Sequence, residues 1–553
     1  MGNTAQLKQT SQKRNDFKFL SKYNCQSIHL IDQLNLNFKR NKINNEGLMS
    51  LGAEISKCAN LTKLSIDISF NKINSEGIQQ LLQGMTQCLL LTYLTLDFCY
   101  NFIQQHGAQE VMREIPKFQK LQYLNINLSQ NQIGDQGLLS IAQYLSQLQS
   151  LTTLILNLNI NNFIQDEGIS KLSSEISKCQ NLNNLTLFLK HNQFKDRAFV
   201  NISKEISRWT VQNLKVDFSK GCITDKQIEI LGKGISKSYC LELLNLDFSQ
   251  NQISERGSTS FKQLISQCRN LKNLQLDFTE QKEFRISYKD EYVQQFVYEA
   301  TCLNLQSYTF IQDEIPLQNG NESLLAKEFW QCQSLLCLKI SIQNGNIGKR
   351  GFFKLLKEVC LFENLQILYL QLKLNQLGSE ELTKLSKQIV QLQKLELLTL
   401  ILGNNEGIGS SLKYLGQSLN RLPSIKQLTI ELQQNQLQDQ DIKDLIFYIS
   451  KCSKLKFLSL DISGNSISSI TLRELTKLIT QGLELNSLKL NFTNSQLSTI
   501  DLNFINQNFS LLKSLYYLQF KFSSDKKEPI KQTTLNRKKY NIFKSLRLVV
   551  LKK

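Results

Sequence analysis

Apolar and polar residues alternate in short segments that return about every 30 residues along the chain. Residues 124–129 read Leu-Asn-Ile-Asn-Leu-Ser, with an apolar residue at every second position. This period of two predicts a strand with one buried face. After Gly137 come Leu138, Ile141, Leu145 and Leu148 at spacings of 3, 4 and 3, which predict one apolar stripe on a short helix. Each segment therefore predicts a strand, a turn and a helix.

The segments share the pattern L-x-x-L-x-L-x-Φ-x-x-N-x-I, where Φ is Phe, Leu or Ile. Aligned on the Asn, the segments give seventeen units. The spacing between successive indexed positions is 30 residues to within one residue, except at one place. A strand–helix unit this small cannot cover its own apolar face, so neighbouring units must stack. We expect the Asn to hydrogen-bond neighbouring backbone as the chain turns. The indexed positions are Asn41, Asn71, Asn101, Asn131, Asn162, Asn192, Gly221, Asn251, Gln281, Ile315, Gly345, Asn375, Asn405, Asn435, Asn465, Ser495 and Asp525.

The repeated L-x-x-L-x-L pattern with its Asn resembles the leucine-rich repeats of the ribonuclease-inhibitor type, over about residues 30–525. The resemblance implies an α/β solenoid shaped like a horseshoe, with parallel strands on the concave face and helices on the convex face. It also implies a role in holding other proteins. This chain places two more residues between the strand leucines and the Asn than the family does, which predicts strands longer by one in–out pair. The composition resembles that of ciliate proteins.

The repeats predict one long domain with a short segment at each end. Residues 1–29 form a basic N-terminal segment and cap, residues 30–525 the solenoid, and residues 526–553 a basic C-terminal cap or tail. Residues 278–316 are irregular, and we interpret them either as an insertion that projects from one rim or as a local distortion. The apolar strand pattern persists there as Tyr308 and Phe310.

Seven of the thirteen cysteines occupy the same repeat position: Cys58, Cys88, Cys179, Cys268, Cys302, Cys332 and Cys452. We interpret them as small apolar side chains packed under the helix ends. The chain has no Cys-x-x-Cys and no Cys/His cluster with zinc spacing, so we expect free thiols, no metal and a reducing, cytoplasmic location.

No catalytic constellation stands out in the sequence. The chain has three scattered histidines and no nucleotide-binding loop, nucleophile elbow, zinc-protease or kinase motif. We therefore expect a protein that is not an enzyme and needs no cofactor. No segment reaches 18 consecutive apolar residues, so we expect no transmembrane helix.

Carboxylates recur at the middle outward position of the predicted strands. Asp217, Asp247 and Asp277 occupy it in three successive repeats, where neighbouring strands lie about 4.8 Å apart. Their mutual repulsion should raise at least one pKa. This row is either a binding strip for a basic partner or inherited repeat sequence without a role in binding. Phe188 and Tyr369 point outward in the same pattern and are candidate contact anchors or scattered surface residues.

Most of the net charge of +18 lies at the two ends of the chain. Residues 1–20 carry +3 and residues 526–553 carry +9, which leaves +6 for the 505 residues between them. The end of the chain either caps the solenoid through Phe543–Leu551 or offers a basic contact through Lys526, Lys527, Arg537, Lys538 and Lys539.

Together these features predict a scaffold or adaptor that binds protein partners of unknown identity over the concave face and rims. Two alternatives remain open. The basic tails would suit a component of an RNA- or nucleoprotein complex, with phosphate contacts that weaken as salt rises. The second alternative is regulation of a small GTPase or another enzyme, because the fold also occurs in activating proteins of small GTPases.

Overall fold

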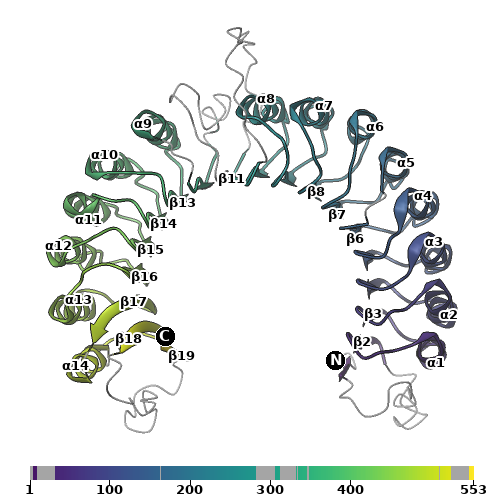
Figure 1. The fold of residues 1–553 in the computed structure, drawn as a ribbon, viewed down its shortest axis with the longest axis horizontal. Coiled ribbons are helices and arrows are strands. Elements are labelled where there is room, and N and C mark those ends of the chain that lie inside the picture. Colours follow the sequence, from purple (N-terminus) through teal and green to yellow (C-terminus); the bar gives the residue numbers. More distant parts are fainter. Residues whose placement is uncertain are drawn as a thin grey trace. The chain divides into compact units, whose positions relative to one another are not determined.

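The structure, a computed structural model, describes residues 4–8, 31–161, 164–281, 305–311, 332, 334–344, 348–497, 499–509, 511–524 and 547–552. Its contacts divide the chain into two compact units, Met1–Cys302 and Leu303–Lys553. In both units, strands and helices alternate along the chain, and the helices cover one face of a parallel sheet (Figure 1). We call the uncovered face the open face of the sheet.

The first unit holds ten described strands and eight described α-helices. Each strand pairs in parallel with the next one along the chain. The strands are β1 (Thr4–Lys8), β2 (Gln33–Asn37), β3 (Lys63–Asp67), β4 (Tyr93–Asp97), β5 (Tyr123–Asn127), β6 (Thr153–Asn157), β7 (Asn184–Phe188), β8 (Asn213–Asp217), β9 (Leu243–Asp247) and β10 (Asn273–Asp277). The helices are α1 (Asn45–Ile55), α2 (Ser75–Met85), α3 (Gln104–Glu114), α4 (Gly134–Leu145), α5 (Asp166–Ile176), α6 (Asp196–Ile206), α7 (Asp225–Ile235) and α8 (Glu255–Ile265).

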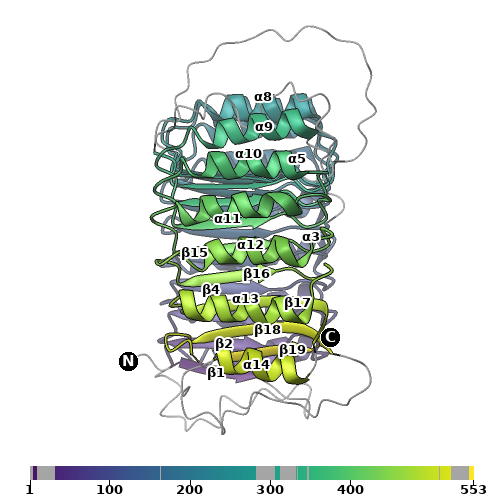
Figure 2. The same ribbon diagram turned by 90° about the vertical axis from the view of Figure 1, so that its left-hand side faces the viewer.

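The second unit repeats the design, and its helices stack in chain order (Figure 2). Its described strands are β11 (Ser307–Ile311), β12 (Cys337–Ser341), β13 (Ile367–Gln371), β14 (Leu397–Ile401), β15 (Gln427–Glu431), β16 (Phe457–Asp461), β17 (Ser487–Leu497), β18 (Tyr517–Ser524) and β19 (Arg547–Lys552). These strands also pair in parallel and in order. The helices are α9 (Gly348–Val359), α10 (Ser379–Ile389), α11 (Leu412–Asn420), α12 (Asp439–Ile449), α13 (Ser469–Gly482) and α14 (Thr499–Phe509).

The predicted strand pattern is confirmed in most details. Leu124, Ile126 and Leu128 are buried, as are Tyr308 and Phe310 in β11. The regular strands end one in–out pair earlier than expected, although backbone pairing continues beyond them: the Phe248 N–H donates to the Asp277 carbonyl at 2.8 Å. Ser129 follows Leu128 at an alternate, polar position of the pattern but is not exposed on the outward face. Its hydroxyl donates to Asn127 Oδ1 at 2.7 Å and the residue is buried.

The indexed asparagines form a buried hydrogen-bonded ladder along each unit. Asn101 Oδ1 accepts the backbone N–H groups of Asn71 and Ile73, both at 3.0 Å. Its Nδ2 donates to the carbonyl of Ile68 in the preceding repeat at 3.1 Å and to that of Phe98 in its own repeat at 2.9 Å. Each Asn thus satisfies backbone groups that neither strand nor helix can pair. Some or all of these contacts recur around Asn131, Asn251, Asn375, Asn405, Asn435 and Asn465.

The ladder corrects the predicted repeat index at Asn162. Asn161 is the buried member, and its Oδ1 accepts the N–H groups of Asn131 and Ile133 at 3.1 Å. The repeat therefore carries one extra residue between Asn161 and the buried Ile164. The loop from α6 to β8 is one residue shorter than its neighbours, so the spacing of later repeats is restored.

The ladder is incomplete next to this insertion and deletion. Gly221 has no side chain to join it, and Asn192 Oδ1 is buried without a partner among the described residues. In the shortened loop, Trp209 takes the place of the repeat cysteine and donates its Nε1–H to the Ser173 carbonyl at 3.0 Å. An apolar cavity of about 20 Å³ remains beside Trp209, lined also by Val216 and Phe218. The cavity and the unpaired Asn192 Oδ1 both lie next to the inserted and deleted residues.

The repeat cysteines are core residues, as predicted, except that Cys302 lies outside the described residues. The other six are buried, and all eleven described cysteines are free thiols. The thiol of Cys88 donates to the Ile55 carbonyl of the preceding repeat at 3.5 Å, and that of Cys268 to the Ile235 carbonyl at 3.3 Å. These carbonyls lie at helix C-termini, where backbone acceptors lack intrahelical partners.

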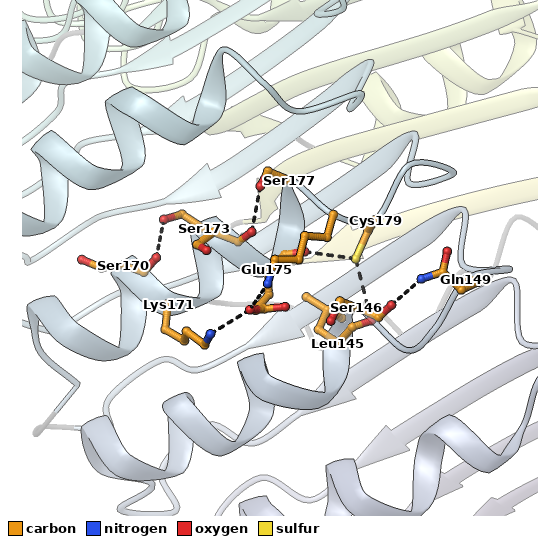
Figure 3. A network of polar contacts seen from close by, with 11 residues as sticks. Leu145, Ser146, Gln149, Ser170, Lys171, Ser173, Glu175, Ser177 and Cys179 are labelled. Atoms are coloured by element: carbon orange, nitrogen blue, oxygen red, sulfur yellow. Dashed lines mark hydrogen bonds and ion pairs between the residues drawn. The ribbon is translucent and has the colours of Figure 1, made fainter.

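A buried carboxylate adds a second type of contact between helices in the first unit. Glu175 of α5 is buried, and its Oε1 lies 2.8 Å from Lys171 Nζ and 2.7 Å from Lys178 Nζ (Figure 3). Burial raises the pKa of Glu175, but hydrogen bonds from Lys171, Lys178 and Ser146 outweigh it, so the pKa is lowered. Ser146 follows α4, so the carboxylate joins two repeats.

Gly221→Asn should stabilise the protein, because it restores the missing ladder oxygen for the N–H groups of Asn192 and Phe194. We expect a gain of about 1 kcal/mol in the free energy of unfolding, from the added hydrogen bonds and the smaller freedom of the unfolded chain. Thermal unfolding measures it. Asn435→Ala, which deletes a ladder member, should lower stability by at least as much. A loss of stability in Gly221→Asn, or no loss in Asn435→Ala, would contradict the role assigned to the ladder.

Glu175→Gln should lower the free energy of unfolding at pH 7 by about 1–2 kcal/mol, because the lysines lose their charged acceptor. A lowered folded pKa means that this stabilisation is present above the unfolded value, about 4.3, and is lost as the pH falls through the folded value. The difference between wild type and variant should therefore shrink below about pH 4. Glu229→Gln, which removes an exposed pair with Lys233, should change stability little. A difference independent of pH would contradict the account.

The repeat cysteines should resist alkylation in the folded protein. Burial raises the pKa of Cys88, Cys268 and Cys452 to about 12, so almost no reactive thiolate exists at pH 8. Cys222 is exposed and serves as the internal control. Iodoacetamide labelling followed by peptide mass spectrometry should modify Cys222 first and the buried thiols only after unfolding. Equal labelling rates would contradict this packing.

Candidate functional site

The open face of the sheet presents three outward side chains from each five-residue strand, in register from strand to strand. In the first unit, the fifth residues of β2–β10 form one continuous row. We call it the last outward row. Its members are Asn37, Asp67, Asp97, Asn127, Asn157, Phe188, Asp217, Asp247 and Asp277.

The structure places the three predicted aspartates side by side. Asp217 pairs in register with Asp247, and Asp247 with Asp277. Burial raises the pKa of Asp217, the hydrogen bonds from Ser219 act in the opposite direction, and the charge of Asp247 adds to the rise. The rise has the expected direction, but burial is its largest cause and the repulsion between the aspartates a smaller one.

The same aspartates also have a structural task. Ser219 donates its backbone N–H and its hydroxyl to Asp217 Oδ1 at 2.9 and 2.6 Å. Asp247 and Asp277 accept the N–H groups of Ser249 and Thr279 at 2.8 and 2.9 Å. Neutral asparagines do this equally well elsewhere in the row, as when Asn127 and Asn157 accept the N–H two residues on, at 3.1 and 3.0 Å.

The turn therefore explains an oxygen acceptor at this position but not its negative charge. Asp217 and Asp247 each use Oδ1 in the turn, and among the described residues no hydrogen bond reaches their second carboxylate oxygen. That oxygen is free to meet a partner. Whether the row binds one stays a prediction.

Two further carboxylate pairs lie at the same strand position. Asp67 faces Asp97 across β3 and β4, and Glu431 faces Asp461 across β15 and β16 of the second unit. Burial raises the pKa of Asp97, and the charge of Asp67 contributes. Burial followed by the charge of Asp461 raises the pKa of Glu431.

The other predicted contacts fall in separate places. Phe188 lies in the last outward row between Asn157 and Asp217 and is half-buried. Tyr369 belongs to the second unit, where its hydroxyl donates to Gln371 Oε1 at 2.5 Å. The predicted tail contacts Lys526, Lys527, Arg537, Lys538 and Lys539 lie outside the described residues. Within the C-terminal segment, β19 pairs with β18, as a capping strand would.

Sequence reasoning missed the aromatic contacts between repeats on the open face and beside it. Tyr93 and Tyr123 stack on β4 and β5 with ring centroids 4.1 Å apart. In the second unit, Lys489 Nζ lies 5.4 Å from the Phe457 ring and 5.6 Å from the Tyr517 ring. Arg40, Phe70 and Tyr100 form a third group in the turns after the strands. Their signal in the sequence is aromatic residues one or two repeats apart at equivalent positions.

The described residues offer side chains for contacts rather than a reaction centre. Among them, no three His, Cys, Asp or Glu residues come together to hold a metal ion. No helix in the described part of the chain is long and apolar enough to cross a membrane. Most outward residues are amides, hydroxyls, carboxylates and tyrosines in regular rows, a surface suited to many small contacts.

Comparison with known proteins supports the repeat assignment. The family described as Leucine Rich repeat matches residues 34–52, 57–82, 119–142 and 147–173. A search of curated proteins found no match. The matched segments belong to the first five repeats, and the same strand, ladder and helix recur through both units. The chain therefore contains leucine-rich repeats and has the α/β leucine-rich-repeat solenoid fold of parallel strands and helices.

Proposed function

We propose that this chain is a non-catalytic scaffold or adaptor that binds a protein partner over the open face of the sheet and its rims. Leucine-rich repeats generally mediate protein–protein binding, and no catalytic family matches the chain. The observation that supports the proposal best is the register of the last outward row, in which successive side chains stand one strand apart.

The mechanism is recognition by many modest contacts on a prepared surface. The ladder and the strand pairing fix the backbone before a partner arrives, so binding costs little ordering of the scaffold. The amides and hydroxyls of the open face supply hydrogen bonds, and Phe188 adds apolar area beside the aspartates. The free carboxylate oxygens of Asp217 and Asp247 favour a partner that brings lysine or arginine to this row.

We place this activity in the cytoplasm. All eleven described cysteines are free thiols, and the six described repeat cysteines are buried in the core. Free thiols in this number suit a reducing compartment.

Replacing Asp217, Asp247 and Asp277 together by Asn should weaken partner binding at least tenfold while preserving the fold. Asn keeps the Oδ1 acceptor for Ser219, Ser249 and Thr279, as Asn127 and Asn157 do, and removes only the charge. The partner is first captured with the native full-length protein, and its affinity is then measured by calorimetry.

The matched control is Asp67→Asn with Asp97→Asn, which removes two charges from the same row elsewhere. This control should bind as wild type does if the partner contacts β8–β10. An unchanged affinity of the triple variant would refute the role of the aspartates. If the affinity of the triple variant is unchanged and substitutions along the whole open face also have no effect, the proposed binding surface is wrong.

A further inference from the structure

Seven side chains in three successive turns of the first unit form a surface that the proposed aspartate row does not include. These turns follow β2, β3 and β4, and they join the strands to α1, α2 and α3. We call this surface the basic–aromatic rim. It consists of Lys39, Arg40, Lys42, Phe70, Lys72, Tyr100 and Phe102.

Arg40, Phe70 and Tyr100 occupy the same position in consecutive repeats and stack on one another. The guanidinium carbon of Arg40 lies 4.7 Å from the centroid of the Phe70 ring. Phe70 and Tyr100 lie 4.2 Å apart at 16° between their planes. All three residues have left-handed backbone, with φ of 57°, 60° and 54°, so equal backbone geometry directs the three side chains alike.

The turns that carry this stack are rigidly connected. The Arg40 N–H donates to the Ser69 carbonyl, and the Phe70 N–H to the Cys99 carbonyl, both at 3.0 Å. The Phe102 N–H donates to the Ile73 carbonyl at 2.7 Å. Because the ladder asparagines Asn71 and Asn101 lie inside the same turns, the surface is ordered before it binds anything.

The surface is exposed and positively charged. Tyr100 and Phe102 are 45% and 49% exposed, and Lys39, Arg40, Lys42 and Lys72 are exposed. Among the described residues, none of these four cations forms an ion pair. The nearby carboxylates of Asp67 and Asp97 accept backbone N–H groups of Ser69 and Cys99 on the open face. Glu76, in the first turn of α2, accepts a hydrogen bond from Asn45 Nδ2.

Stacking on Phe70 also leaves the guanidinium N–H groups of Arg40 available to bind an anion. A guanidinium that lies over an aromatic ring keeps the N–H groups in its own plane available, and this planar fork matches a carboxylate in two parallel hydrogen bonds. Lys39, 5.4 Å from the same ring, adds positive charge beside it. Tyr100 and Phe102 add exposed apolar area two repeats further along.

We propose that the basic–aromatic rim binds an acidic, extended segment of a protein partner. The positive charge of the rim attracts a negatively charged segment. The exposed rings provide apolar contact for an apolar side chain within that segment. Two repeats span about 10 Å, which is about three residues of extended chain. The segment therefore carries an Asp or Glu at Arg40 and an apolar residue about three positions away, at Tyr100 and Phe102.

The arrangement of the rings favours a peptide over single-stranded nucleic acid. Bases bind such surfaces by stacking on free aromatic faces. The repeats before and after Phe70 supply Arg40 and Tyr100, which cover the two faces of its ring. Only the edge of the Phe70 ring is left for a ligand, so the rim lacks a continuous row of free aromatic faces on which successive bases could stack. This inference rests on the proposed function, since it names the chemistry of one partner segment.

The test is a selection of displayed random 12-residue peptides on the full-length protein. The selected peptides should be rich in Asp and Glu and carry an apolar residue about three positions from an acidic one. Fluorescence anisotropy then measures the affinity of one selected, labelled peptide for wild type and variants. Arg40→Gln and Lys72→Gln should each weaken it, Arg40→Gln at least tenfold, with unchanged thermal unfolding.

Lys220→Gln is the matched control. Lys220 has the same repeat position as Arg40 and the same left-handed backbone, with φ of 56°, but it lies outside the rim. Its substitution should leave the affinity unchanged. Selected peptides without acidic residues, or equal affinities for wild type and Arg40→Gln, would overturn the inference. So would tighter binding, sensitive to Arg40, of a 12-residue uridine oligonucleotide or of phosphatidylserine vesicles.

The result is separable from the proposed function. A captured partner that binds Arg40→Gln as it binds wild type, but binds the triple Asn variant of the aspartate row weakly, would leave the scaffold function standing and overturn the rim. If Arg40→Gln weakens binding of the captured partner and the triple Asn variant does not, the result would support the role of the rim and refute the role of the aspartate row.

Discussion

The side-chain amide of the repeat asparagine is the contact on which the rest of each unit depends. Every turn from strand to helix leaves backbone groups that no regular element can pair, and burying them unpaired would cost more than the hydrogen bonds gain. One amide supplies an acceptor to the preceding turn and donors to two carbonyls. Because the backbone groups that it binds belong to two adjacent repeats, the amide also fixes the distance between these repeats. Strand register, helix spacing and the left-handed residues beside the Asn follow from that connection.

The surfaces proposed for binding depend on the ladder for the same reason. A row of side chains one strand apart is a property of the backbone spacing and not of any single residue. The aspartate row lies before the turn and the basic–aromatic rim lies within it, so both are ordered by contacts that a partner does not have to supply. Left-handed backbone at Arg40, Phe70 and Tyr100 is costly in isolation. It persists because the hydrogen bonds of the turn determine it.

Repetition in the sequence was enough to predict the strands, the helices, the buried cysteines and the alignment of Asp217 with Asp247 and Asp277. It could not choose between Asn161 and Asn162, since both fit the pattern and only burial and hydrogen bonding distinguish them. It could not show that the aspartates serve the turn, because that role depends on the N–H two residues on. The Arg40–Phe70–Tyr100 stack needed side-chain directions that a left-handed turn sets. Trp209 and its cavity arise from one inserted and one deleted residue, which an average repeat conceals.

Hydrogen exchange of backbone amides in the full-length protein tests the role of the ladder most directly. The amides of Ile73, Ile103 and Ile133 donate to ladder oxygens, whereas the equivalent amide of Phe194 faces Gly221. The account predicts slow exchange at the three isoleucines and clearly faster exchange at Phe194. Equal protection at all four positions, or exchange at the isoleucines as fast as at exposed Lys42 and Lys72, would contradict the claim that the asparagine ladder holds the repeats in register.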